Sequence, residues 1–180
     1  SGISIDISVL DVVLMGFNPY LGLFEHPSKK MRESALQILA QVGLAPKASM
    51  NYLHLSEGQK QLCILARALV ADNKLLLLDE PESALDFHYR YRILSLIRDW
   101  VKKTKNSTIV TLHDPVLSLN YCDSLLLLSK GKVSGIIHLQ TDSIELMEQR
   151  LRKIYGNISL QYVTAQNGNR QLIMLNEDDL

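Results

Sequence analysis

The sequence predicts an α/β protein built around a parallel sheet, because short apolar runs alternate with helical stretches through its centre. Residues 75–78 and 108–112 are apolar or β-branched runs, which suit strands buried on both faces of a sheet. A long helix is expected between them, over residues 87–103. Strands that alternate with helices are typical of a doubly wound fold, in which parallel strands lie between helical layers.

The N-terminal part predicts helices without strands. Ser8 suits the N-cap of a helix that Gly16 would end, and a second helix is expected from residue 29 to residue 42. The loop between them, residues 17–27, is rich in turn-forming and aromatic residues. A third helix is expected over residues 59–71, where apolar residues recur with a helical period.

The C-terminal part predicts two pairs of strands and one more helix. An apolar strand over residues 124–128 is followed by a turn at Lys130-Gly131 into another strand. Asp142-Ser-Ile-Glu145 has the pattern of a capping box that opens a helix running to about Tyr155. Asn167-Gly168 lies between two strand-like runs and predicts a hairpin.

Composition argues against several classes of function. The 180 residues are 47% hydrophobic, which is enough for a globular core, and Lys plus Arg equals Asp plus Glu at 19 each. Because the chain has no net charge and no basic stripe, a nucleic-acid partner is not expected. Cys63 and Cys122 lack metal-ligand spacing and suit reduced thiols of a cytosolic protein. No apolar stretch is long enough to span a bilayer, so work at a membrane would need a partner.

A polar turn, Leu55-Ser-Glu-Gly-Gln59, stands immediately before the helix expected at 59–71. It places a hydroxyl, a glycine and free backbone N–H groups at a helix N-terminus, which is a favourable position for an anion. The same turn also suits an ordinary helix start with Ser56 as its cap. Both interpretations stay open from the turn alone.

Two carboxylates, Asp79 and Glu80, follow the run 75–78. Ligands of open α/β sheets bind outside the carboxyl ends of the strands, where one carboxylate could hold Mg²⁺ and the other could orient or deprotonate water. Both could instead begin a solvated turn that Pro81 closes. His113 ends the second strand, and parallel pairing would bring it to the same edge as a candidate contact for a phosphoryl group. A histidine at a strand end is also often only structural or exposed.

Four segments, taken in order and with their separations, resemble the ABC ATPase family. Leu55 to Gln61 is similar to the signature motif, and residues 75–81 to the Walker B strand with its catalytic glutamate. Ser83-Ala-Leu-Asp86 is similar to the D-loop, and Thr111-Leu-His-Asp114 to the switch histidine. Each motif is weak alone, but four in register are very specific. The resemblance implies a partial P-loop NTPase (ABC ATPase) fold with a parallel sheet, a helical signature subdomain, and a C-terminal helix plus β-hairpin.

The resemblance also implies roles for named residues. Two copies would close head to tail around two ATP molecules, with Asp79 holding Mg²⁺ and Asp86 linking the two sites. Glu80 would polarise the attacking water, and His113 would touch the γ-phosphate. The implied contacts to the ATP held by the other copy are made by Ser56, Glu57, Gly58 and Gln59.

Further segments are similar to the importer branch that serves iron–siderophores, haem and cobalamin, which molybdate importers share. Implied partners are a second ATPase subunit, a transmembrane permease that residues 17–27 would contact, and indirectly a periplasmic or surface substrate-binding protein. The implied location is the cytoplasmic face of the cell membrane. The segments that carry this similarity are Val9 to Gly16, Asn18-Pro-Tyr20, Tyr121-Cys-Asp123 and Lys153 to Gly156.

The chain departs from the family pattern in three ways. The phosphate loop, G-x-x-x-x-G-K-[ST], occurs nowhere in it, and in the family this loop precedes everything found here. We therefore expect a C-terminal fragment or truncated product of a longer subunit, inactive alone. Glu57 replaces the first glycine of the usual signature and is expected to point to solvent. Glu82 replaces the usual threonine before the D-loop.

The resemblance divides the chain into three domains: a helical signature subdomain (1–58), the C-terminal half of the ATPase core (59–138), and a C-terminal helix with a β-hairpin (139–180). Two other functions stay open. One is a non-transport ABC ATPase of repair or translation, which would usually carry a second cassette or a coiled-coil insertion. The other is an inactive binding module that only occupies the permease or the partner subunit.

Overall fold

The structure is a computed structural model that describes residues 6–22, 24–71, 73–83 and 85–178. The chain forms two compact units, Ser1–Thr111 and Leu112–Leu180, and each has its own apolar core. The division into three domains at residues 58 and 138 stays a prediction. None of the described helices combines the length and hydrophobicity that a bilayer-spanning segment needs.

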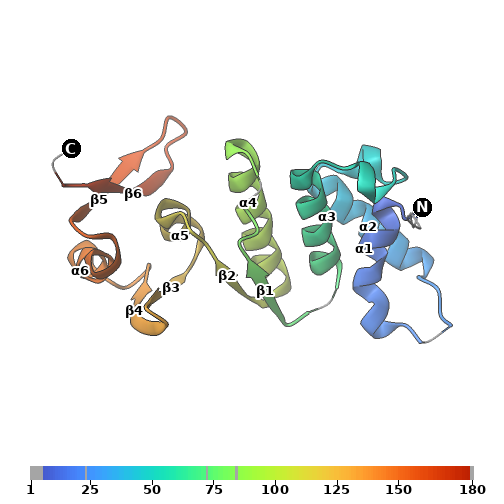
Figure 1. Cartoon of the computed structure of the whole chain (residues 1–180), viewed down its shortest axis with the longest axis horizontal. Helices are drawn as coiled ribbons and strands as arrows, with labels where there is room; N and C mark the ends of the chain where they lie inside the picture. The colour runs from blue at the N-terminus through green and yellow to red at the C-terminus, as the bar shows by residue number, and fades with distance from the viewer. Residues whose placement is uncertain (1–5, 23, 72, 84, 179–180) are drawn as a thin grey trace. The chain divides into compact units, whose positions relative to one another are not determined.

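The helices of the first unit form where caps and apolar spacing predict them. A serine precedes each of the three and accepts a backbone N–H of its first turn, as an N-cap does. α1 packs against both α2 and α3 (Figure 1). The three helices are α1 (Val9–Leu14), α2 (Lys29–Gln41) and α3 (Glu57–Val70), joined by the 3₁₀ segments η1 (Met15–Tyr20), η2 (Ala45–Lys47) and η3 (Tyr52–His54).

Gly16 has a different role from the predicted one. α1 ends at Leu14 and continues directly as η1, so Gly16 does not end the helix. A Cβ at position 16 would lie 2.3 Å from the carbonyl oxygen of Arg67 and 2.7 Å from a side-chain carbon of Val70. Glycine is required here because the backbone of η1 approaches α3 closely.

The parallel pairing predicted from the alternating pattern is confirmed for two strands. β1 (Leu75–Asp79) pairs in parallel with β2 (Ser107–Thr111), and α4 (Phe87–Thr104) lies between them in the chain. The register places Leu75 opposite Ser107 and Asp79 opposite Thr111. The carboxyl ends of both strands therefore meet at one edge.

The prediction that these strands are buried on both faces is wrong. Leu76 is buried, but Leu75 and Leu77 are 50% and 68% exposed, and Ile109 on β2 is 61% exposed. Side chains alternate between the two faces of a strand. The rest of the described unit covers only one face of the β1–β2 pair, and the other presents apolar side chains.

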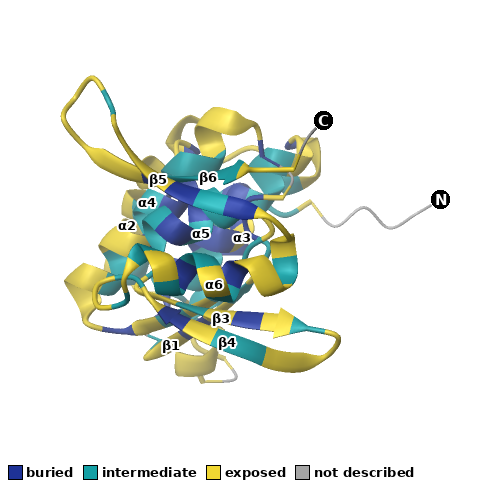
Figure 2. Ribbon diagram, turned by 90° about the vertical axis from the view of Figure 1, so that its left-hand side faces the viewer, coloured by how far each residue is buried: buried dark blue, intermediate teal, exposed yellow. Residues whose placement is uncertain are grey.

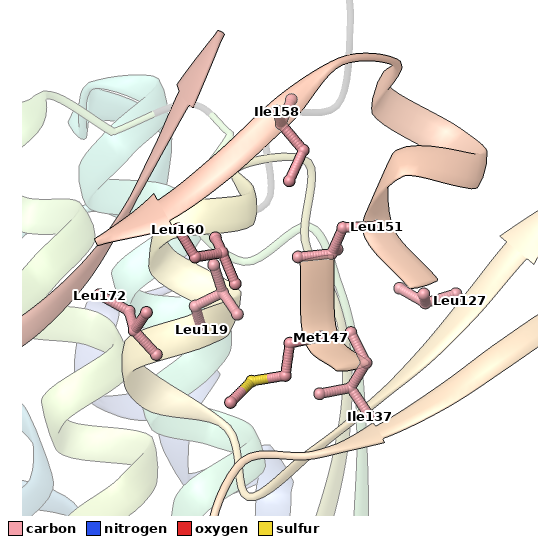
Figure 3. Close-up of a cluster of buried hydrophobic side chains, with 8 residues drawn as sticks. All are labelled: Leu119, Leu127, Ile137, Met147, Leu151, Ile158, Leu160 and Leu172. Carbon is pink, nitrogen blue, oxygen red and sulfur yellow. The ribbon is translucent and has the colours of Figure 1, made fainter. Parts of the chain in front are cut away.

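The second unit packs two helices against two antiparallel hairpins. Its core side chains converge from α5, the first hairpin, α6 and the second hairpin (Figure 3). Glycines with positive φ, Gly131 and Gly168, occupy the two turns. The second hairpin projects a largely exposed tip (Figure 2). The elements are α5 (Pro115–Tyr121), β3 (Ser124–Ser129), β4 (Lys132–His138), α6 (Ile144–Tyr155), β5 (Ile158–Thr164) and β6 (Arg170–Asn176).

The start of α6 differs by one residue from the predicted capping box. Ser143, rather than Asp142, is the N-cap, and its hydroxyl accepts the N–H of Leu146. Asp142 instead accepts the backbone N–H of His138 at 2.9 Å and pairs with Arg150 at 2.6 Å. Because Asp142 binds both His138 of β4 and Arg150 of α6, its carboxylate does not cap the first turn of α6. It instead links the end of β4 to that helix.

A side chain, rather than a strand, meets the outer edge of the second hairpin. The Asn120 amide accepts the N–H of Leu172 at 2.9 Å and donates to the carbonyl of Leu172 at 2.8 Å. Asn120 lies on α5, so this pair of hydrogen bonds ties β6 to that helix.

Candidate functional site

The polar turn predicted from the sequence forms the first turn of α3. Ser56 Oγ accepts the N–H of Gln59 at 3.3 Å, and Gln59 Oε1 accepts the N–H of Ser56 at 3.3 Å, which completes a capping box. Lys47 also donates to Gln59 Oε1, at 3.0 Å. The helix-cap interpretation is thus confirmed. The turn also brings a positive charge close to the helix N-terminus, which favours an anion in the same place.

Glu57 points to solvent, as predicted. Its side chain is 80% exposed and forms an ion pair with Lys60 at 2.7 Å, one turn along α3. The hydrogen bond to Glu57 raises the pKa of Lys60. The carboxylate that replaces the family glycine is therefore partly neutralised by a neighbouring ammonium and directed away from the helix axis.

Asp79 and Glu80 form a turn at the end of β1 that Thr111 of β2 holds. Thr111 Oγ1 donates to Asp79 Oδ1 at 2.6 Å and accepts the backbone N–H of Glu80 at 2.9 Å. Glu80 has a φ of 44°, in the left-handed region that residues other than glycine seldom occupy. From α3, Gln61 Nε2 donates to the backbone carbonyl of Glu80 at 3.0 Å.

These contacts argue against the alternative interpretation, in which the two carboxylates merely begin a solvated turn. Asp79 is exposed and Glu80 half-buried, but the turn is fixed from two neighbouring elements. Asp79 Oδ2 has no hydrogen bond among the described residues, so the arrangement leaves a carboxylate oxygen for a hard cation. An exposed carboxylate oxygen at a strand end fits the ligand preference of Mg²⁺. In the described parts of the chain, no three His, Cys, Asp or Glu side chains form a ready-made metal cluster.

The predicted D-loop leads into α4. Asp86 is the N-cap of α4 and accepts the N–H of Tyr89 at 3.1 Å, while Ala84 lies outside the described residues. Glu82 is only 4% exposed, and its Oε2 has no hydrogen-bond partner among the described residues. Asp86 therefore has a structural role as a cap, and its role across a dimer stays a prediction.

His113 belongs to the second unit. It is exposed, and it stands two residues after the end of β2 and one before Asp114, the N-cap of α5. Asp114 accepts the N–H groups of Val116 and Leu117. The prediction that His113 contacts a phosphoryl group beside Asp79 and Glu80 stays a prediction.

Sequence reasoning missed Gln61 and Thr111, the two side chains that hold the carboxylate turn. A signal for Thr111 existed, because parallel pairing of the two apolar runs places it opposite Asp79. Gln61 gave no such signal, because it reaches Glu80 only through the packing of α3.

Comparison with known proteins places this arrangement in a family. The family described as ABC transporter matches residues 5–83, which contain the polar turn and both carboxylates. A family of AAA domains, described with the AbiEii toxin of a type IV toxin–antitoxin system, matches residues 47–120. An iron chelatin transport ATP-binding protein of Helicobacter pylori, named as probable, is 38% identical over 71% of this chain and 50% of its own length. The chain belongs to the ABC transporter ATP-binding family.

Other ABC transporter proteins agree with this assignment. The molybdate import ATP-binding protein MolC of Haemophilus influenzae is 37% identical over 68% of this chain and 49% of its own length. A solved ABC transporter described as of putative metal-chelate type, in an inward-facing conformation, superposes with a TM-score of 0.80 and 28% identity, over 98% of this chain and 70% of that one. The ATP-binding cassette MJ0796 in a dimeric post-hydrolysis state, with ADP and phosphate, gives a TM-score of 0.64 and 26% identity, over 74% of this chain and 57% of that one. The fold is therefore the α/β ABC ATPase fold, and the chain spans about half the length of the first curated relatives that it matches.

Proposed function

We propose that this chain supplies the signature turn and the hydrolytic carboxylates of an ABC importer ATPase. The observation that carries the proposal is the turn at the end of β1, where a half-buried glutamate is held next to an exposed aspartate. Phosphoryl transfer to water depends mainly on positioning and on charge neutralisation, and a fixed carboxylate pair contributes to both.

Each residue has a distinct part in the proposed reaction. Asp79 would hold Mg²⁺, which neutralises charge on the transferred phosphoryl group. Glu80 would orient the attacking water and accept its proton. His113 would contact the γ-phosphate.

The first turn of α3 would act on the nucleotide held by a second copy. The backbone N–H groups of Glu57 and Gly58 stand at the start of a 14-residue helix, beside the ammonium of Lys47. A helix N-terminus with an adjacent cation attracts phosphate oxygens. The two copies would thus complete one another's sites, with Asp86 at the junction.

The cargo that we propose is an iron chelate, haem, cobalamin or a related metal compound. The support comes from relatives named for iron chelatin, cobalamin and molybdate import, and from the metal-chelate type transporter. A transmembrane permease would receive the motion of the ATPase through residues 17–27, at the cytoplasmic face of the membrane. A substrate-binding protein would act through that permease.

ATP hydrolysis by the complete ATPase tests the proposal. The complete ATPase is this chain joined to the phosphate-loop segment that the family carries before it. Glu80→Gln should lower kcat by roughly 10²–10⁴-fold, the usual scale for loss of a general base, while ATP still drives dimerisation. Glu33→Gln, on the exposed surface of α2, is the matched control and should leave kcat unchanged. Wild-type hydrolysis by Glu80→Gln would refute the assigned base, and absence of hydrolysis in the unmodified complete protein would favour an inactive binding module.

A further inference from the structure

The backbone of Glu80 is held in a conformation that a glutamate does not adopt by itself. Among the described residues other than glycine, Lys105 and Lys130 also have positive φ, but Lys105 ends α4 and Lys130 lies in the β3–β4 turn, where left-handed residues are common. Glu80 directly follows a strand. A conformation of this kind persists only where the surroundings enforce it, and such residues concentrate at functional sites.

One enforcing group is the hydroxyl of Thr111. It lies opposite Asp79 in the β1–β2 register and bonds both residues of the carboxylate turn, as donor to Asp79 and as acceptor from Glu80. Removal of the hydroxyl would release the Glu80 N–H and the Asp79 carboxylate together.

The other enforcing group is the amide of Gln61. Its Nε2 donates to the carbonyl of Glu80, and its Oε1 is buried without a hydrogen-bond partner among the described residues. Among the described residues, the hydrogen bond to the Glu80 carbonyl is therefore the one that the structure shows for the Gln61 amide. Thr111 of β2 thus binds the N–H of Glu80, and Gln61 of α3 binds its C=O.

We propose that Gln61 and Thr111 are positioning residues, which hold Glu80 in the left-handed conformation that aims its carboxylate at the attacking water. This inference rests on the proposed ATPase function. Relaxation of Glu80 to the right-handed region would rotate φ by roughly 110° and turn the Cβ direction away from the strand end. Because Gln61 lies on the helix that begins with the Ser56–Gln59 turn, the contact also joins the two parts of the proposed site within one chain.

Steady-state kinetics of the complete ATPase give the first test. Gln61→Leu and Thr111→Val each remove the hydrogen bonds with little change of volume, and each should lower kcat by about 10–100-fold, the scale of a displaced catalytic group. KM for Mg-ATP should change much less, because neither residue is proposed to contact the nucleotide. Thr111→Ser keeps the hydroxyl and should restore most of kcat. Gln37→Leu, at an exposed position on α2, is the matched control.

The outcomes separate this inference from the proposed function. If Glu80→Gln is inactive while Gln61→Leu and Thr111→Val keep the wild-type kcat, the positioning role is refuted and the ATPase function stands. If Glu80→Gln remains active, the proposed function itself fails.

Amide NMR of the 180-residue chain gives a second test that needs no activity. Thr111→Val should move the Glu80 amide proton to lower frequency, because it loses its acceptor, and Thr111→Ser should not. An unchanged Glu80 amide in Thr111→Val would overturn the inference. If Thr111→Val does not fold, the same comparison between Gln61→Leu and the unmodified chain decides it, since relaxation of the turn must also move this amide.

Discussion

Replacement of Gly16 by alanine should destabilise the first unit through one steric clash. A methyl group at position 16 would lie 2.3 Å from the carbonyl oxygen of Arg67, far inside van der Waals contact. The oxygen belongs to the backbone of α3, so relief of the clash requires η1 or α3 to move. Overpacking of this kind costs about 1–3 kcal/mol. Alanine also restricts the unfolded chain, which offsets roughly 0.4–1 kcal/mol of that loss.

Urea unfolding monitored by circular dichroism measures this difference. Gly22→Ala is the matched control, because its Cβ would meet only the flexible side chain of Glu25, at 3.4 Å. We expect Gly16→Ala to lower the free energy of unfolding by about 1–2 kcal/mol and Gly22→Ala to change it by less than about 0.5 kcal/mol. A Gly16→Ala chain as stable as the Gly22→Ala chain would refute the close approach of η1 to α3.

Three further predictions concern nucleotide binding, ATP-driven dimerisation and the reactivity of the Cys63 thiol. The 180-residue chain alone should bind Mg-ATP weakly or not at all, because it contains no phosphate loop; micromolar affinity in calorimetry would contradict this. In the complete ATPase, Gly58→Asp should abolish ATP-driven dimerisation, measured by light scattering, because it adds a carboxylate where the partner's phosphate is proposed to lie; normal dimerisation would leave the turn only a helix cap. Burial raises the pKa of Cys63 to about 11, so alkylation of the folded chain should be slow at pH 8 and should rise with pH through 9 and 10. Fast alkylation at pH 8 would show that the thiol is accessible and ionised.

Local patterns were sufficient to predict most helices and strands. The helical spacing of apolar residues gave α2 and α3 to within two residues at each end, and the Asn167-Gly168 turn gave the second hairpin. These features depend on neighbours within a few residues, which the sequence displays directly.

Features that depend on distant contacts could not be predicted in this way. Gly16 has the position of a helix terminator, and only its proximity to Arg67 shows that it serves packing. Asp142 satisfies a capping pattern, but Arg150 binds it, and Ser143 takes its place. The carboxylates of the site were predicted from their position at the end of a strand. The hydrogen bond from Gln61 to Glu80 could not be predicted, because it depends on how α3 folds against the turn after β1.

The contact between Asn120 and Leu172 has a consequence for self-association. An exposed strand edge attracts strands from other molecules, which is how many proteins begin to aggregate. Asn120 offers to β6 the same donor and acceptor that an incoming strand would offer, and it uses both on Leu172. At this position the outer edge of the hairpin is therefore already saturated by its own chain. A third strand that paired with β6 at Leu172 would first have to displace the Asn120 carboxamide.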